Sequence, residues 1–134
     1  MSIRTMEVFF PGGKRVDARY AGFTIKTDQR KENGGEGLVP APYDLFMASI
    51  ATCAGIYVLS FLQKRGLATE GAGITARFHR DPGTHRLSKI DLDIRLPSDF
   101  PEKYRGAIIR AADQCAVERT IMDPPEITTK VVDQ

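Results

Sequence analysis

The 134-residue sequence has no tryptophan, only two cysteines and two histidines, and no excess of charge of one sign. Nineteen basic residues nearly balance 17 acidic ones, and neither sign forms a cluster, so we expect no nucleic-acid-binding surface. In a reducing compartment, two cysteines far apart in the sequence are not expected to form a permanent disulfide. The length and the 42% share of apolar residues are typical of one globular domain, residues 1–134.

The longest apolar segment, LFMASIATCAGIYVLSFL at residues 45–62, contains no charged residue and no histidine. It meets the lower length limit of a membrane-spanning helix, but it contains serine, threonine and glycine and lacks a tryptophan belt. A helix that is apolar on all sides is either a core helix or a membrane span, and we interpret this one as a fully buried core helix, with no membrane association. The segment MSIRTMEVFF lacks the apolar stretch of a signal peptide, so we expect a cytoplasmic protein.

Alternating apolar and polar residues, separated by turn-forming residues, predict short strands on both sides of this helix. The strands are expected at residues 6–10, 14–20, 22–28, 73–81, 87–97 and 126–132. A loop rich in glycine, proline and charge, residues 29–42, precedes the long helix. We expect the helix from Pro42 or Tyr43 to about Arg65, ending at Gly66, and a second helical region at residues 98–122. The predicted fold is α+β, with the order β-β-β-α-β-β-α-β.

The long apolar helix has to be covered on every side. In a single chain of this length, a sheet can cover one side of the helix, and another element must cover the other side. A second copy of the chain is the simplest cover, and closed two-fold dimers are the commonest assembly. We therefore expect a homodimer.

The two cysteines are both expected to face the core. Cys53 lies inside the long apolar helix, and Cys115 shares one face of the second helical region with three other residues, Tyr104, Ile108 and Ala112. The thiols can be buried filler, since free cysteine is among the most buried residue types. They can also form a metal site with His79 and His85, although these spacings match no zinc pattern. The third interpretation is a redox-active pair.

A redox-active Cys53 would need a positive charge from another part of the chain. Its position in the middle of a helix excludes help from the N-terminus of that helix, and apolar neighbours raise the pKa of a thiol. The candidate cations lie in the N-terminal strands and the following loop, namely Arg4, Arg15, Arg19 and Arg30, and Asp44 or Glu36 is the candidate orienting carboxylate. Asp44 precedes Cys53 by about 13–14 Å of helix, so it would act through an arginine or a bound substrate.

Two segments, VPAPYDLFMASIATCAGIYVLSFLQKRGL and RAADQCAVERTI, resemble the OsmC/Ohr family of osmotically induced and organic-hydroperoxide-resistance proteins. The similar features are a glycine-rich loop, a proline, an acidic-leucine pair that opens the helix, a cysteine after a small residue, and a second cysteine followed by a short helical tail. The expected order of strands and helices also fits, so the resemblance covers nearly the whole chain.

The resemblance implies an intertwined homodimer that reduces organic hydroperoxides at its interface, without a metal or cofactor. Cys53 matches the peroxidatic cysteine, which is oxidised to a sulfenic acid, and Cys115 matches the resolving cysteine, which forms a disulfide with it. An external dithiol reductant then restores both thiols.

The remaining site residues are assigned as follows under this resemblance. Arg30 is the first choice for the activating cation, with Asp44 as its carboxylate, and Arg15 or Arg19 is the second choice. An apolar pocket favours alkyl hydroperoxides over hydrogen peroxide because it buries the alkyl group. Aromatic side chains are expected to line this pocket: Tyr43, Phe46 and Tyr57.

Two positions depart from the family pattern. The best-studied branch has glutamate directly after the proline that opens the helix, whereas this chain has Tyr43 there and Asp44 one residue later. Ala116 stands where a proline usually follows the second cysteine. Two alternative functions also stay open. One is a thiol redox sensor whose disulfide changes a partner interaction. The other is a non-enzymatic protein of the same fold that binds a small apolar ligand, in a pocket with four candidate lining residues: Tyr43, Phe46, Tyr57 and Phe61.

Overall fold

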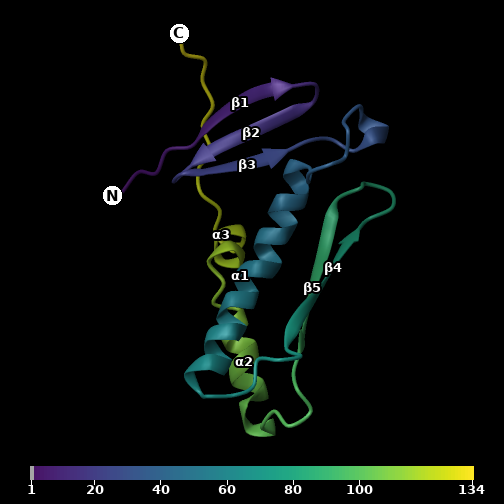
Figure 1. Ribbon diagram of the computed structural model, residues 1–134. Coiled ribbons are helices and arrows are strands. Elements are labelled where there is room, and N and C mark those ends of the chain that lie inside the picture. The colour runs from purple at the N-terminus through teal and green to yellow at the C-terminus, as the bar shows by residue number, and fades with distance from the viewer. Residues whose placement is uncertain (1) are drawn as a thin grey trace. The chain divides into compact units, whose positions relative to one another are not determined.

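The computed structural model describes residues 2–134 of the chain (Figure 1). It divides into two compact units, the first ending at Ala48 and the second beginning at Ser49. The long helix α1 (Pro42–Lys64) contributes its first residues to the first unit and the rest to the second.

The first unit contains a three-stranded antiparallel sheet in the order β1-β2-β3. Its strands are β1 (Glu7–Gly12), β2 (Arg15–Tyr20) and β3 (Phe23–Thr27), so the first three predicted strands are confirmed. The register places an apolar row across the sheet, formed by Val8, Ala18 and Ile25. After β3, the predicted loop contains a single turn of 3-10 helix, η1 (Lys31–Asn33).

Both ends of α1 follow the signals in the sequence. At its start, the Asp44 carboxylate accepts a hydrogen bond from the backbone N–H of Ala41 (3.0 Å), the arrangement of an acidic residue in the first turn that caps the helix. At its end, Gly66 adopts a φ of 62°, which favours glycine. The N–H of Leu67 then donates to the carbonyl of Leu62 (2.9 Å) and closes the helix.

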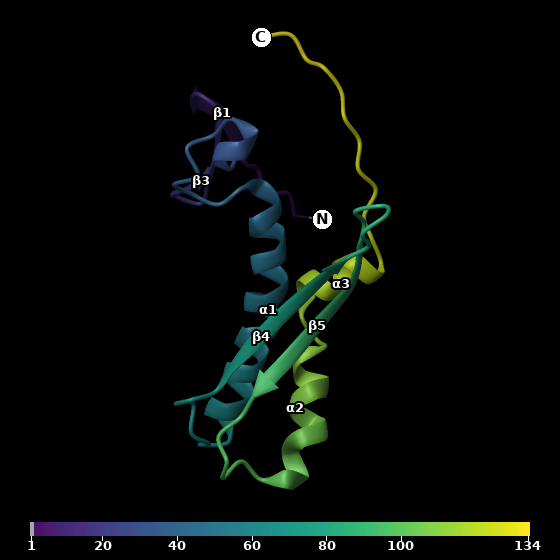
Figure 2. The same cartoon turned by 90° about the vertical axis from the view of Figure 1, so that its right-hand side faces the viewer.

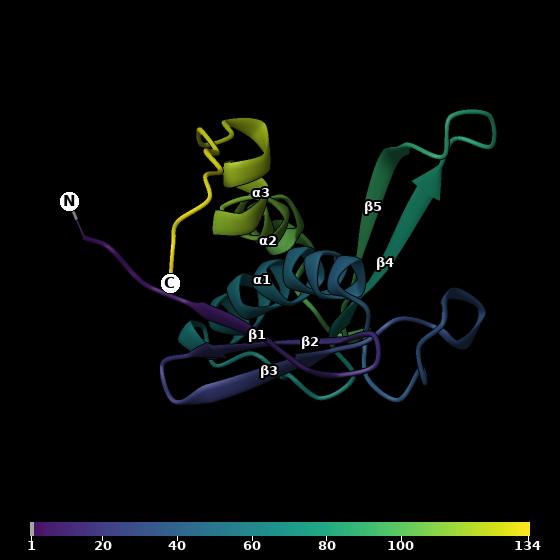
Figure 3. The same ribbon diagram turned by 90° about the horizontal axis from the view of Figure 1, so that it is seen from above.

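The second unit combines the rest of α1 with a β-hairpin and two short helices. The hairpin consists of β4 (Gly73–Arg80) and β5 (Leu87–Arg95), and it confirms the two strands predicted there. The helices are α2 (Arg105–Ala112), preceded by the 3-10 turn η2 (Glu102–Tyr104), and α3 (Ala116–Met122). Figures 2 and 3 show α2 and the hairpin beside α1 in two further views.

The core of the second unit forms where α1 meets α2 and the hairpin. It is built around the buried residues Ala54, Val58, Phe61, Leu62, Phe100, Ile108, Ala112 and Cys115. Apolar side chains of the hairpin, among them Ile74, Leu92 and Ile94, pack against this cluster. The alternation predicted for the hairpin therefore places its apolar face on the core.

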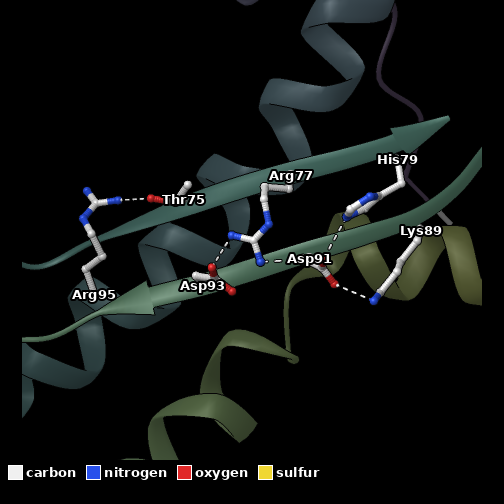
Figure 4. A network of polar contacts seen from close by, with 7 residues as sticks. All are labelled: Thr75, Arg77, His79, Lys89, Asp91, Asp93 and Arg95. Atoms are coloured by element: carbon white, nitrogen blue, oxygen red, sulfur yellow. Dashed lines mark hydrogen bonds and ion pairs between the residues drawn. The ribbon is translucent and has the colours of Figure 1, made fainter.

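The other face of the hairpin carries a network of charged side chains (Figure 4). Asp91 lies at its centre and contacts His79 (2.8 Å), Lys89 (3.5 Å) and Arg77 (3.7 Å). Arg77 also forms an ion pair with Asp93. Because each of these side chains is partly exposed, the network stabilises the hairpin without requiring the removal of a buried charge from water.

Two predicted elements differ in the structure. The second helical region is not continuous, because α2 ends at Ala112 and α3 begins at Ala116. The strand predicted at residues 126–132 is not formed, and residues 124–134 have no regular secondary structure. A strand needs a neighbouring strand for its backbone groups, and this segment has none among residues 2–134; Val131 is 95% exposed.

The prediction that α1 is fully buried is also wrong for the single chain. Only five of its residues are buried, whereas Ile56 is 52% exposed. Within residues 2–134, α1 alone is long and apolar enough to cross a membrane, a property that core helices of soluble proteins share. A mostly apolar helix with an exposed stripe needs a further surface to cover it.

The charged face of the hairpin should make stability depend on acid pH. Contacts with His79 and with Arg77 hold the pKa values of Asp91 and Asp93, respectively, below their ordinary range. Carboxylates with lowered pKa values stabilise the fold above their unfolded-state pKa, and this stabilisation is lost as the pH falls through the lower folded-state value. We expect the free energy of unfolding in urea to fall below about pH 4. The double variant Asp91→Asn/Asp93→Asn should have a lower free energy of unfolding than the wild type at pH 6, and this free energy should fall less as the pH is lowered. The same dependence of the free energy of unfolding on pH in both proteins would contradict this prediction.

Candidate functional site

The structure brings the two cysteines together inside the second unit. Cys53 is partly buried on α1, and Cys115 is completely buried at the N-cap of α3. Both thiols are free, and their side chains are hydrogen-bonded to each other. The backbone N–H of Glu118 also donates to the sulfur of Cys115 (3.4 Å). The two thiols thus lie within reach of one another at the first turn of α3.

The Cys53 thiol has a pKa below its ordinary value. Burial raises this pKa. Hydrogen bonds from the Cys115 side chain and from the backbone amides of Val117 and Ala116 lower it by a larger amount. The sequence excluded only the N-terminus of the helix that carries Cys53, and it did not anticipate a contribution from another helix. The N-terminus of α3, rather than that of α1, supplies the amides that stabilise the thiolate.

The pKa of Cys115 moves in the opposite direction. Burial raises it, and so does the hydrogen bond to Cys53, whereas the amides of Glu118 and Val117 lower it by less. Cys53 therefore loses its proton more readily than Cys115 does. A nucleophilic thiolate next to a protonated second thiol is the arrangement required for oxidation of one cysteine and condensation with the other.

This chain has alanine at position 116, where the family pattern has proline, and this difference adds a hydrogen-bond donor near Cys53. Proline has no N–H group, so it could not donate to the sulfur of Cys53. Ala116 donates one of the hydrogen bonds that lower the pKa of Cys53. The break before α3 leaves this amide without a helical partner, because Cys115 has an extended conformation (φ −48°, ψ 123°).

Arg30 and Asp44 come together in the first unit. Nη2 of Arg30 lies 3.6 Å from Oδ1 of Asp44, and the other oxygen of Asp44 accepts the hydrogen bond that caps α1. The Arg30 side chain is 66% exposed, so its guanidinium is accessible to solvent. Glu36, the other candidate carboxylate, contributes its backbone N–H to a hydrogen bond with Asp28 (3.0 Å).

The other candidate arginines have partners within the sheet of the first unit. Arg15 forms an ion pair with Asp17 (2.6 Å), and the guanidinium of Arg19 stacks over the ring of Phe9 at 4.0 Å. Arg4 donates a hydrogen bond to the hydroxyl of Tyr20 (3.2 Å).

The aromatic residues expected to line the substrate pocket belong to α1. In the first unit, the ring centroids of Tyr43 and Phe46 lie 5.4 Å apart. In the second unit, Tyr57 is partly exposed. The sequence did not predict a cavity of about 440 Å³ between β5 and α2. Its apolar lining consists of Leu92, Ile94, Leu96, Ile108, Ile109 and Ala112. The alternation of β5 indicated its apolar face, but not the gap that separates this face from α2.

The described part of the chain offers no cluster of metal ligands. Within residues 2–134, no three histidine, cysteine, aspartate or glutamate side chains lie close enough to hold a metal ion. His79 contacts Asp91 on the charged face of the hairpin, and His85 lies in the turn that follows β4.

The fold and the site define a class of α+β protein with two adjacent thiols, one of which lies on a long apolar helix. The model of the family described as OsmC-like protein matches residues 34–130, and the chain belongs to this family. The resemblance seen in the sequence is thereby confirmed. No curated protein sequence matches the chain.

Solved structures share this fold at low sequence identity. A Psychrobacter arcticus protein described as an osmotic stress induced and detoxification response protein has a TM-score of 0.73 at 20% identity, over 90% of this chain and 89% of that one. An OsmC-like protein of Mycoplasma pneumoniae has a TM-score of 0.66 at 14% identity, over 92% and 89% of the two chains. A Vibrio cholerae protein described as an organic hydroperoxide resistance protein, with captopril bound in one of its active sites, has a TM-score of 0.56 at 19% identity, over 92% and 88% of the two chains.

The role of the α3 amides can be tested with Ala116→Pro. Proline suits the first position of a helix, and the conformation of Cys115 is the one that a residue before proline adopts, so the fold should persist. Removing one hydrogen bond to the thiolate should raise the pKa of Cys53 and slow its alkylation by iodoacetamide at pH 7 by at least about threefold. The measurement is the pH dependence of alkylation, resolved for each cysteine by mass spectrometry.

The matched control is Ala116→Gly, which keeps the N–H group and should react like the wild type. An unchanged pH profile in Ala116→Pro would show that the amide of residue 116 does not stabilise the thiolate.

Proposed function

We propose that this protein is a thiol-dependent peroxidase that reduces organic hydroperoxides. The observation that carries the proposal is the contact between two thiols whose pKa values move in opposite directions, that of Cys53 downward and that of Cys115 upward. Membership of the OsmC-like family and the fold shared with organic hydroperoxide resistance proteins support it. The chemistry is assigned to the cytoplasm, where thiols are kept reduced.

The proposed reaction uses both cysteines in sequence. The Cys53 thiolate attacks one oxygen of the hydroperoxide, the O–O bond breaks, and the leaving alkoxide takes up a proton to become the alcohol. Cys53 is then a sulfenic acid, and the sulfur of Cys115 attacks it, releasing water and forming the Cys53–Cys115 disulfide. An external dithiol supplies the two electrons that return both thiols by exchange.

Arg30 and Asp44 have a supporting role in this proposal. The Arg30 guanidinium supplies positive charge that favours the thiolate and the developing alkoxide, and Asp44 orients it. The support is their 3.6 Å ion pair and the exposure of the Arg30 side chain. Tyr43, Phe46 and Tyr57 are assigned to the apolar surface that receives the alkyl group.

The proposed active form is a homodimer. The first unit exposes apolar side chains of its sheet, including Phe10 (79% exposed) and Phe23, and α1 exposes Ile56. The segment at residues 124–134 has exposed β-branched residues, such as Val131, and no strand partner. A second copy of the chain offers the same surfaces in return, as an isologous interface requires.

One observation favours a second candidate function, that of a binder of small apolar ligands. The cavity between β5 and α2 has the volume of a small-molecule site and a mostly aliphatic lining, to which three charged residues also belong: Asp93, Arg105 and Asp113. In this alternative, the protein holds an aliphatic ligand there, and the thiols stay unreactive towards hydroperoxides.

The two cysteine variants test the peroxidase proposal. Cys53→Ser should abolish consumption of cumene hydroperoxide, because no thiolate remains to attack the peroxide. Cys115→Ser should complete one rapid turnover and then accumulate over-oxidised Cys53, because no thiol resolves the sulfenic acid. The measurements are peroxide consumption by the reduced proteins after the reductant has been removed, so that no external thiol can resolve the sulfenic acid, and intact-mass spectrometry of the protein. Full activity in both variants would refute the mechanism.

A thiol count on the wild-type protein separates the candidate functions. After one equivalent of cumene hydroperoxide, the peroxidase should lose both thiols to an intramolecular disulfide, and it should do so faster than with hydrogen peroxide. A binder should keep both thiols. A redox sensor should form the disulfide but turn over poorly with a dithiol.

The homodimer can be tested on the exposed side of α1. Ile56→Asp places a charge on an apolar surface that the dimer is proposed to bury, so the protein should become monomeric in size-exclusion chromatography with light scattering. Ile56→Val keeps the surface apolar and should remain dimeric. A monomeric wild type, or a dimeric Ile56→Asp protein, would contradict the proposal.

A further inference from the structure

Asp28 is a buried carboxylate to which the proposed reaction gives no role. It follows β3 directly, at the start of the loop that carries Arg30 (Figure 1), and it is only 2% exposed. Hydrogen bonds from the backbone amides of Gln29 and Glu36 lower its pKa by more than burial raises it. Asp28 is therefore ionised at neutral pH, and the structure satisfies its charge with donors from the loop.

Asp28 holds the loop between β3 and α1 at three points. Its Oδ1 accepts a hydrogen bond from the N–H of Gln29 (2.7 Å), and its Oδ2 accepts one from the N–H of Glu36 (3.0 Å). Its own N–H donates to the carbonyl of Pro40 (3.1 Å). The beginning, the middle and the end of the loop are thus fixed to a single residue.

The loop packs so closely on Asp28 that position 35 has no room for a side chain. A Cβ atom at Gly35 would overlap the carbonyl of Gln29 and lie 2.7 Å from Oδ1 of Asp28. The N–H of Gly35 donates to the carbonyl of Arg30 (3.1 Å), and the N–H of Gly37 donates to that of Gln29 (3.1 Å). The same turn therefore fixes the backbone of Arg30.

The ion pair between Arg30 and Asp44 is too weak to fix this loop by itself. Its atoms lie 3.6 Å apart and the Arg30 side chain is mostly exposed, and exposed ion pairs contribute little to stability. Hydrogen bonds to a buried, ionised carboxylate are shorter and stronger. Asp28, rather than Asp44, therefore determines where the loop holds the backbone of Arg30.

We propose that Asp28 is a positioning residue for Arg30, because it fixes the loop at residues 29–41 and so sets the guanidinium beside Asp44. The proposal rests on the proposed function, in which Arg30 supplies positive charge for peroxide reduction. Asp28 touches neither thiol nor peroxide in this scheme and acts only through the loop.

The test begins with Asp28→Asn, which keeps the size of the side chain but replaces one acceptor oxygen with an NH₂ group. We expect the rate constant for oxidation of Cys53 by cumene hydroperoxide in a single turnover to fall roughly tenfold in the folded protein. Amide hydrogen exchange at residues 29–41 should become faster, and this readout does not depend on activity.

Asp81→Asn is the matched control. Asp81 also accepts hydrogen bonds from the backbone N–H groups of a turn, those of Gly83 (2.8 Å) and Thr84 (2.9 Å), but this turn joins β4 to β5 in the second unit. Its substitution should leave both the single-turnover rate constant and the exchange of residues 29–41 unchanged. Should Asp28→Asn fail to fold, Gly35→Ala displaces the loop from an intact carboxylate and should give the same two changes.

The double variant shows whether Asp28 acts through Arg30. If it does, Asp28→Asn/Arg30→Ala should be no slower than Arg30→Ala alone. Three results would each overturn the positioning role of Asp28 and leave the role of Arg30 intact. They are additive slowing in the double variant, unchanged hydrogen exchange in Asp28→Asn, and a wild-type rate in Asp28→Asn when Arg30→Ala is slow. A wild-type rate in Arg30→Ala overturns the assignment of Arg30 as well, and a wild-type protein that consumes no hydroperoxide overturns the proposed function itself.

Discussion

The contact between Cys53 and the start of α3 is the interaction on which the acidity of the Cys53 thiol depends. A sulfur atom on an apolar helix would ordinarily keep its proton, because burial disfavours the charged form. Here the thiol of Cys115 and the backbone amides of Val117 and Ala116 direct donors at it and reverse that tendency. Apolar surroundings and a lowered pKa of the Cys53 thiol are therefore found at the same site.

That contact exists because the second helical region is interrupted. A continuous helix would use the N–H groups of residues 116 and 117 for its own hydrogen bonds, whereas the extended backbone at Cys115 leaves them free. The core then fixes their position, since Ile108 and Ala112 of α2 pack in the same buried cluster as Ala54 of α1. Packing and electrostatics are linked here, because the residues that bury Cys115 also place the donors for Cys53.

In the first unit, the loop between β3 and α1 carries the exposed side chain of Arg30. The residues that the sequence marked as functional, Arg30 and Asp44, do form a pair, and Asp44 also caps α1. The buried carboxylate of Asp28 was not singled out from the sequence, because an aspartate before a glycine-rich loop has no distinctive spacing. Only its burial and its three contacts with the loop distinguish it from a surface charge.

Patterns in the sequence predicted the local elements: alternation predicted the strands of the sheet and the hairpin, and Pro42 and Gly66 predicted the two ends of α1. These signals act over a few residues, so they survive without knowledge of the fold. The tertiary structure alone decided that Cys53 meets the N-terminus of α3 and that residues 126–132 form no strand within one chain. Both outcomes depend on contacts between segments that are distant in the sequence. Packing decides which donors reach the sulfur of Cys53, and it also decides whether the backbone groups of residues 126–132 find a neighbouring strand.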